Sequence, residues 1–303
     1  MPFELSRADR DMMHGVIDMH LHAHPCLYER PFNEIECAEQ ARAAGYRGLV
    51  LKSIFAPNAD RIELVRKIVP GIELFGSLVL NNSVGGLNPE ALRASIGFGV
   101  KVVWLPTIHA ANHVRYFGVP TYPWQTKRGN ELAQTKAPPI DLLDADGNLK
   151  AEVVEIIALC HQSDLVLGTG HIALPEVMAV LAEAKRIGYR KMVVTHVGWH
   201  ATDWPIDAIK EMLPYGCTFE FTINPQMPNR QQASPKDFAA RIRAVGVENC
   251  VVSTDLGQHD TAHPIEGFRM WLRMLLVQGF SLDDIDVMAR RNPARLLDLP
   301  AAA

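Results

Sequence analysis

The sequence predicts one domain over residues 1–303, a (β/α)8 barrel of the TIM type with a long loop insertion after strand four. Short apolar runs alternate with helical stretches along the whole chain, and there are eight such runs. Most of them are continuously apolar, which is typical of parallel strands covered on both faces. The rival is an open doubly wound sheet, which favours a Gly-rich phosphate loop that this sequence lacks.

The first half of the chain accounts for four strands and three helices. Asn88 before Pro89 is typical of a helix start, while Gly45 and Pro70 mark helix ends. The expected strands are 15–19, 48–51, 74–80 and 100–104, and the expected helices are 33–44, 59–69 and 89–97.

Residues 107–150 interrupt the alternation. They show little periodicity and contain Pro120, Pro123, Pro138 and Pro139. So long a loop in a compact domain is unusual unless it is functional, and an active-site lid is one such function. Residues 140–149, around Asp146-Gly147, predict a small hairpin.

The second half resumes the same pattern. Its expected strands are 165–168, 192–195, 217–221 and 250–254. Its expected helices are 151–163, 175–187, 206–213, 235–245, 266–278, 283–290 and 292–297.

Composition and charge exclude several classes of protein. With 48% hydrophobic and 21% charged residues the chain is neither disordered nor a coiled coil. A net charge of -4 argues against nucleic-acid partners and membrane surfaces, which favour a basic face. No apolar run reaches the length of a membrane span, and the first residues show no apolar stretch typical of a signal peptide, so we expect neither feature. The five scattered cysteines form no C-x-x-C pair, so we expect a reduced, cytoplasmic location and no thiolate zinc site.

Polar residues gather where the predicted strands end, which is where barrel enzymes carry their chemistry. In an extended strand His20 and His22 point to the same side and can chelate one cation. A lone H-x-H is common by chance, but His171 follows the fifth predicted strand and Asp255 the eighth. These four residues predict a site for one Zn2+, Mn2+ or Fe2+ ion, with Asp255 also taking a proton from water. His196, after the sixth strand, can polarise a substrate carbonyl.

This arrangement resembles the amidohydrolase superfamily, and so does the C-terminal segment Arg291-Asn292-Pro293-Ala294-Arg295-Leu296-Leu297. More narrowly, several segments resemble an uncharacterised family within that superfamily: 48–52, 84–89, 103–107, 169–171 and 253–258. The resemblance implies a barrel fold and a metal-dependent enzyme. It implies no substrate, because members hydrolyse amides, lactones, esters and amines, and some decarboxylate.

One departure from the superfamily pattern favours one ion over two. Binuclear members bridge their metals with a carboxylated Lys or a Glu after strand four, whereas this strand ends in Trp104-Leu105-Pro106-Thr107 and Lys101 lies at its other end. A second ion would have to use Lys52, His196 and Glu220. Lys52 has two further interpretations, as an ammonium that binds a substrate carboxylate and as half of a structural ion pair with Glu220.

Other polar or aromatic residues near strand ends are candidates for binding substrate, each with a plainer alternative. Asn81 can equally satisfy turn backbone. His109 and His113 lie in the insertion and can equally be solvated surface, and His24 is expected in a loop or behind the ligands. The predicted substrate-binding residues are Lys52, Asn81, His109, His113, Trp199 and His259.

The sequence therefore predicts a metal-dependent hydrolase that cleaves a C–N or C–O bond of an amide, cyclic amide or lactone in a small, polar, anionic substrate. One alternative is a metal-dependent, non-oxidative decarboxylase of a small aromatic acid. Another is a non-catalytic, metal-stabilised binding barrel. Barrels of this size are often symmetric, so a homodimer or homotetramer is expected.

Overall fold

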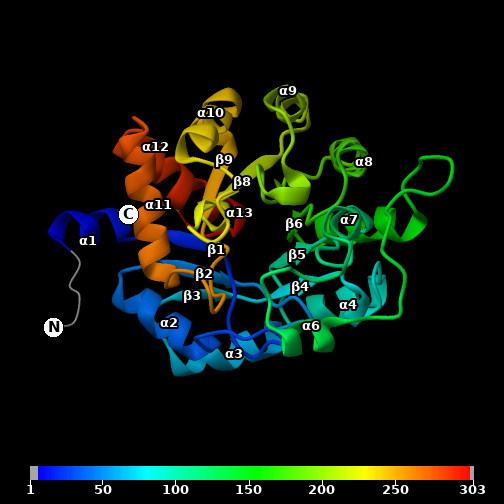
Figure 1. Ribbon diagram of the computed structural model, residues 1–303, viewed down its shortest axis with the longest axis horizontal. Coiled ribbons are helices and arrows are strands. Elements are labelled where there is room, and N and C mark those ends of the chain that lie inside the picture. Colours follow the sequence, from blue (N-terminus) through cyan, green and yellow to red (C-terminus); the bar gives the residue numbers. More distant parts are fainter. Residues whose placement is uncertain (1–5, 301–303) are drawn as a thin grey trace.

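The computed structural model describes residues 6–300, in which parallel strands form the centre and helices surround them (Figure 1). Two sheets are present, with strand orders β1-β2-β3 and β4-β5-β6-β7-β8-β9. The strands are β1 Ile17–Leu21, β2 Gly48–Leu51, β3 Glu73–Phe75, β4 Ser77–Val79, β5 Val102–Trp104, β6 Val166–Gly168, β7 Met192–Val194, β8 Thr218–Thr222 and β9 Cys250–Ser253.

The predicted third strand, 74–80, is divided into β3 and β4 at Gly76. A Cβ at Gly76 would lie 2.4 Å from the Cα of Ala59, so only glycine lets the first residue of α3 approach this closely. The two sheets also meet where β1 contacts the segment that follows β9. There the Asp255 amide donates to the His20 carbonyl at 2.7 Å, and the His22 amide donates to the Leu256 carbonyl at 2.8 Å. The parallel α/β class is therefore confirmed, while full closure of a barrel stays a prediction.

The helices agree with the predicted ones to within a few residues, and α4 and α10 agree at both ends. Helix α1 was not predicted, and the predicted helix 206–213 stops at Lys210 because Pro214 has no N–H for a helical hydrogen bond. The helices are α1 Arg7–Met13, α2 Glu34–Ala43, α3 Ala59–Ile68, α4 Pro89–Gly97, α5 Ala111–Phe117, α6 Lys127–Ala133, α7 Ala151–Gln162, α8 Leu174–Arg186, α9 Ile206–Lys210, α10 Pro235–Val245, α11 Pro264–Val277, α12 Leu282–Asp286 and α13 Asn292–Leu296. The 3₁₀ turns are η1 Asn82–Val84, η2 His200–Thr202, η3 Leu213–Tyr215, η4 Asn224–Gln226 and η5 Val247–Asn249, and η6 Val287–Arg291 is a π-helical turn.

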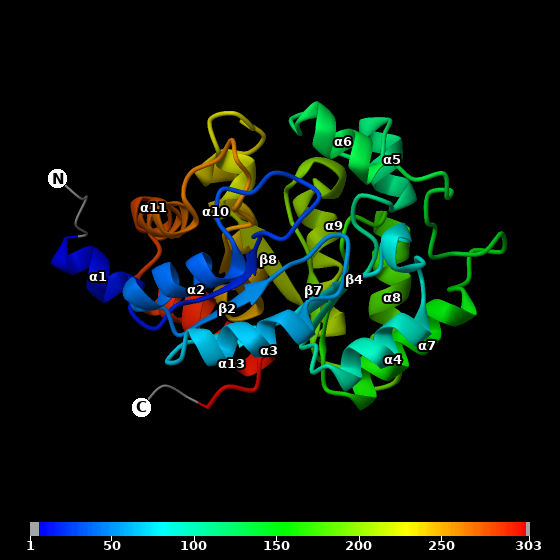
Figure 2. The same cartoon turned by 90° about the horizontal axis from the view of Figure 1, so that it is seen from below.

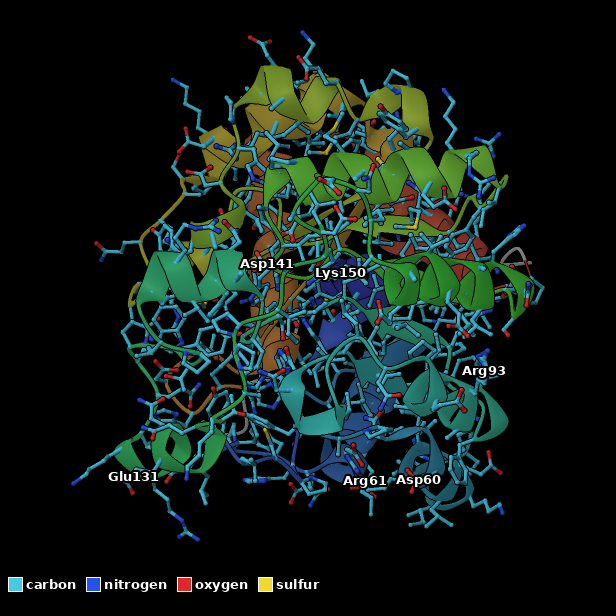
Figure 3. The ribbon with its side chains drawn as sticks, turned by 90° about the vertical axis from the view of Figure 1, so that its right-hand side faces the viewer. Asp60, Arg61, Arg93, Glu131, Asp141 and Lys150 are labelled. Atoms are coloured by element: carbon cyan, nitrogen blue, oxygen red, sulfur yellow. The ribbon has the colours of Figure 1, made fainter. Side chains whose placement is uncertain are left out.

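The stretch 107–150 is more ordered than its sequence predicted, because it contains α5 and α6. Seven-residue helices are too short to show a clear periodicity. The expected hairpin is present as an antiparallel bridge between Leu143 and Leu149. Figure 2 shows α5 and α6 together, at the end of the molecule opposite α13. Figure 3 shows this stretch from outside, with Glu131 at the α6 end and Asp141 near Lys150.

The apolar core has two parts. An inner cluster enclosed by the strands includes Met19, Val50, Trp104 and Val193. A larger shell packs between the strands and the helices. Within residues 6–300 there is no helix long and apolar enough to span a membrane.

Candidate metal centre

The two histidines of β1 reach the inside of the sheet because the strand contains a bulge. Between Asp18 and Leu21 the strand advances three residues while its partner β2 advances two. Met19 belongs to the inner cluster and Leu21 to the outer shell, although a regular strand would send both to the same side. The extra residue reverses the alternation, so that His20 and His22 face inward at the carboxyl end of the strand.

Asp18 fixes the strands that carry the ligand candidates. Its buried carboxylate accepts from the Thr254 hydroxyl at 2.6 Å, the Thr254 amide at 3.0 Å and the His20 amide at 3.1 Å. It thereby ties the bulge of β1 to the turn that carries Asp255.

The hydrogen-bond partners of His22 and His20 determine where their lone pairs point. His22 Nδ1 lies 3.0 Å from the Lys52 carbonyl oxygen, which can only accept, so Nδ1 carries the proton. His20 Nδ1 is likewise 3.0 Å from Glu220 Oε1. Burial lowers the pKa of His20 to about 3 and that of His22 well below its usual value, so both rings are neutral near pH 7. Each Nε2 is then an unprotonated acceptor.

Both bare nitrogens face the same carboxylate oxygen. Asp255 Oδ1 lies 3.0 Å from His22 Nε2 and 3.2 Å from His20 Nε2. Three electron-rich atoms thus converge in a buried place, where their mutual repulsion is costly unless a cation lies among them. Two imidazole nitrogens and a carboxylate oxygen are a donor set that suits Zn2+, Mn2+ or Fe2+.

His171 is oriented by a chain of hydrogen bonds from the 107–150 stretch. His113 Nε2 is 3.0 Å from the Thr121 carbonyl oxygen, so it carries the single proton of the neutral ring. The His113 Nδ1 lone pair then accepts from His171 Nδ1, at 2.9 Å. His171 Nε2 is left bare, and it is buried without a hydrogen-bond partner among residues 6–300. An orphaned nitrogen of this kind fits a metal ligand.

His196 and Glu220 lie on the other side of His20. His196 Nδ1 is buried, has no hydrogen-bond partner in the described residues, and lies 3.8 Å from both Glu220 Oε2 and Asp255 Oδ2. His196 has a left-handed backbone, at φ 56°, in the turn after β7. Burial raises the pKa of Glu220 to about 7. Two overlapping groups can hold a cation by geometry, one of His20, His22 and Asp255 and one of His20, His196 and Glu220.

Lys52 lies inside the cluster. Its Nζ is 3.0 Å from His20 Nε2 and 4.7 Å from the centre of the Trp104 ring. Burial lowers the pKa of Lys52 to about 8, against the opposing pull of Asp255 and Glu220. Only glycine fits beside Trp104 at position 168, since a Cβ there would lie 2.5 Å from the Trp104 ring. Lys52 therefore competes with any metal for the lone pair of His20.

A cavity of about 290 Å3, counted with its open mouth, leads to His22 and Asp255. The residues that line it are His22, Arg30, Ile54, Tyr122, Trp124, Gln125, Trp199, Asn224, Asp255 and Gln258.

The structure brings together three of the four predicted ligands, His20, His22 and Asp255. The ring of His171 lies 5.1 Å from that of His196 and belongs to neither group, so its role as the fourth ligand stays a prediction. Trp199 lines the cavity as predicted for a substrate-binding residue.

Five of the predicted substrate-binding residues do not line this cavity, so their roles stay predictions. The Asn81 side chain forms hydrogen bonds with turn backbone: it donates to the Ile54 carbonyl and accepts from the Thr107 amide. His113 holds His171 instead, Lys52 is buried among the ligands, and His259 is exposed. His109 is buried elsewhere in the stretch 107–150, and His24, outside that set, accepts from the Arg30 amide.

Sequence reasoning missed most of the cavity wall. Arg30 lies in the irregular segment between β1 and α2, and Tyr122 and Trp124 lie between α5 and α6. The only available signal was a charged residue or an aromatic pair in a loop at the carboxyl end of the strands. Spacing within a loop does not show which side chains converge.

Comparisons with known proteins agree on the fold. A model of a family of unknown function, DUF6282, matches residues 15–220. Among curated proteins, no sequence matches the chain. Among solved structures, an amidohydrolase from Pseudomonas aeruginosa matches at 14% identity with a TM-score of 0.61, over 97% of this chain and 98% of that one. A probable dipeptidase from the same organism matches at 11% with a TM-score of 0.66, over 96% and 97%.

A lactonase from Listeria monocytogenes is similar as well, at 13% identity and a TM-score of 0.57, over 94% of this chain and 95% of that one. These structures carry different named activities on one fold. The predicted resemblance to the amidohydrolase superfamily is confirmed, at the level of fold.

Proposed function

The chain belongs to DUF6282, a family of unknown function, and we propose that it is a metal-dependent hydrolase of a small, anionic amide, cyclic amide or lactone. The observation that carries the proposal is the set of unprotonated ligand nitrogens, of which His20 Nε2 alone has a donor, the Lys52 ammonium. His22 Nε2 and His20 Nε2 face one oxygen of Asp255, and His171 Nε2 has no partner among residues 6–300. A buried set like this one is explained by a cation that it holds.

A bound Zn2+, Mn2+ or Fe2+ ion would polarise a substrate carbonyl and make a water acidic enough to attack near neutral pH. His20, His22 and Asp255 would hold the ion, with His171 as the fourth ligand. The second oxygen of Asp255 and His196 Nδ1 lie 3.8 Å apart, so either can take a proton from the attacking water. When His196 takes the proton, it can then donate that proton to the leaving group.

One ion is favoured over two by the surroundings of His20. Its Nδ1 lies 3.0 Å from Glu220 Oε1, the usual arrangement of an outer carboxylate that orients a ligand histidine. A second ion at His20, His196 and Glu220 would need that nitrogen deprotonated. Glu220 then acts by positioning His20, and Lys52 by balancing the buried carboxylates.

The rival account is a cluster without metal, in which the ammonium of Lys52 is the only cation. Lys52 satisfies the lone pair of His20 at 3.0 Å. It leaves His22 Nε2 against Asp255 and His171 Nε2 with nothing to bind. Metal content therefore decides between the two accounts.

The test begins with protein purified without nickel, treated with a chelator and then reloaded with zinc, manganese or iron. We expect about one ion per chain by elemental analysis. Lactones, cyclic amides and amides that carry an anionic group are then screened in 18O-labelled water, and a hydrolase places the label in the product. Release of CO2 with no label in the other product would favour the decarboxylase instead.

His20→Ala supplies the decisive variant. Full metal content together with full activity in His20→Ala contradicts the proposal, and so does wild-type protein that takes up no ion after reloading. A metal-loaded protein with no turnover across the screen favours the binding barrel. The cytoplasmic location and the homo-oligomeric state stay predictions.

A further inference from the structure

Arg30 is a buried cation that forms no ion pair within residues 6–300, although the Asp255 carboxylate lies farther off in the same cavity. Its residue is 6% exposed and lines the cavity beside His22 and Asp255. Its one side-chain hydrogen bond within residues 6–300 is a long one, 3.4 Å from Nη1 to the Gly257 carbonyl. Its Nε is buried without an acceptor, and no carboxylate in the described part lies within 4.0 Å of the guanidinium. A guanidinium offers five N–H donors, so most of them are unused by the protein.

Other arginines at this end of the molecule are paired. Arg230, only 8% exposed, forms a two-pronged ion pair with Asp260 at 2.9 and 3.0 Å. Arg61 binds Glu34 in the same way, at 3.1 and 3.2 Å. An unpaired buried charge costs folding free energy, so its presence at a cavity indicates a ligand that completes it.

The chemistry of the cavity indicates which ligand. Its walls include the flat rings of Tyr122, Trp124 and Trp199, and the cavity is narrow. A planar carboxylate matches the fork of an arginine through two parallel hydrogen bonds. A phosphate would call for more donors than this single guanidinium, and no other arginine or lysine lines the cavity.

We propose that Arg30 binds a carboxylate of the substrate, so that the enzyme acts on small, flat carboxylic acids. This rests on the proposed function, because it places the reacting bond of such a substrate at His22 and Asp255. It also reassigns the anion-binding role from Lys52, which is buried among the ligands, to Arg30. The neighbouring Gln125 Oε1, buried and unpartnered within residues 6–300, can accept from a donor on the same substrate.

The experiment measures binding of matched probes by NMR titration, in chelator-treated and in zinc-reloaded protein. The probes are benzoate and benzamide, acetate and acetamide, and inorganic phosphate. The variants are Arg30→Gln and Arg30→Lys, and the matched control is Arg61→Gln, which removes an arginine that already has a carboxylate partner. Chelator-treated protein separates binding at Arg30 from binding to a metal.

We expect wild-type protein to bind at least one carboxylate about tenfold or more tightly than its amide, with or without zinc. Arg30→Gln should weaken that carboxylate by roughly tenfold to a hundredfold, since hydrogen bonds to charged groups contribute about 1.5–3 kcal/mol. Arg30→Lys should keep part of the affinity, because it keeps the charge without the fork. Arg61→Gln should bind like the wild type.

Three results would overturn the inference. They are wild-type protein that binds no carboxylate more tightly than its amide, a folded Arg30→Gln variant with unchanged carboxylate affinity, and phosphate bound more tightly than either carboxylate. The first and third need only wild-type protein, so they hold even if Arg30→Gln fails to fold. Carboxylate binding at Arg30 in a protein that takes up no metal would reject the proposed function and leave this inference standing.

Discussion

The two ends of the parallel strands bring charged residues together in opposite ways. At the amino end, Lys101 and Lys191 each lie 2.5 Å from Asp298 Oδ2, and Lys191 also lies 2.6 Å from Asp164. Both acids there are largely exposed, with 47% and 67% of their side chains accessible. At the carboxyl end the ionisable side chains are buried, and several polar atoms have no partner among residues 6–300.

The difference separates charges that support the fold from charges that await a ligand. The amino end satisfies its charges internally, so Lys101 is a structural residue, in agreement with its predicted position at the wrong end of its strand. At the carboxyl end His22 Nε2 lies against the Asp255 carboxylate, and Arg30 forms no ion pair within residues 6–300. Both features lower the stability of the folded state. Such a cost at a binding site is the common trade-off between stability and activity.

The largest effect should come from Asp255→Asn, which keeps the shape and removes the charge that faces two bare nitrogens. We expect zinc affinity to fall by more than the roughly 10–100-fold that outer partners of a metal typically contribute, and activity to fall with it. The metal-free variant should melt no lower than metal-free wild type, because the repulsion is gone. Calorimetric zinc titration measures the affinity, and thermal melting measures the stability. An Asp255→Asn variant that binds zinc as tightly as wild type would contradict the proposed difference between the two ends.

Metal removal should be the next largest effect, and it should act at one end alone. A ligand present at a thousand times its dissociation constant stabilises the folded state by about 4 kcal/mol. Wild-type protein and an Asp298→Asn variant should therefore lose the same stability on chelation, whereas Asp255→Asn should lose little. Denaturant melts with and without zinc measure this, and equal losses in all three proteins would contradict the assignment.

His113→Leu should have a smaller effect, because His113 acts through His171. Without an acceptor at 2.9 Å, His171 Nδ1 no longer has a fixed proton, and we expect zinc affinity to fall roughly 10–100-fold. His113→Asn places an amide oxygen near the same position and should restore part of the affinity. If His113→Leu and His113→Asn bind zinc with the same affinity as each other, the contact between His113 and His171 contributes only packing.

The smallest effect should be at the amino end. Burial raises the pKa of Asp298, but hydrogen bonds from Lys101 and Lys191 outweigh it and hold the pKa at about 2. Because the pKa is lower in the folded than in the unfolded state, the contribution is present above pH 4 and is lost as the pH falls toward 2. Asp298→Asn should cost less than about 1 kcal/mol near neutral pH, since Asp298 is half exposed, and progressively less as the pH falls through about 2. Unfolding free energies across this range measure it, with zinc binding unchanged as the control.

The sequence predicted the ligand candidates better than the cavity. His20 and His22 follow from a two-residue spacing in a strand, and Asp255 from its place at a strand end. The proposed substrate contacts depended on loops, and five of the six predicted residues do not line the cavity. Strand ends are located by periodic patterns, whereas loop side chains have no period to follow.

The sequence by itself determined the parallel α/β class, all eight expected strands and the convergence of polar residues at one end, because apolar periodicity and strand direction are local properties. Tertiary structure decided the rest. The bulge in β1 that turns His20 and His22 inward depends on the pairing with β2. The orientation of His171 by His113 and the position of Arg30 at the cavity depend on contacts between segments far apart in the chain. Their geometry exists only once the strands and the loops at their carboxyl ends have packed together.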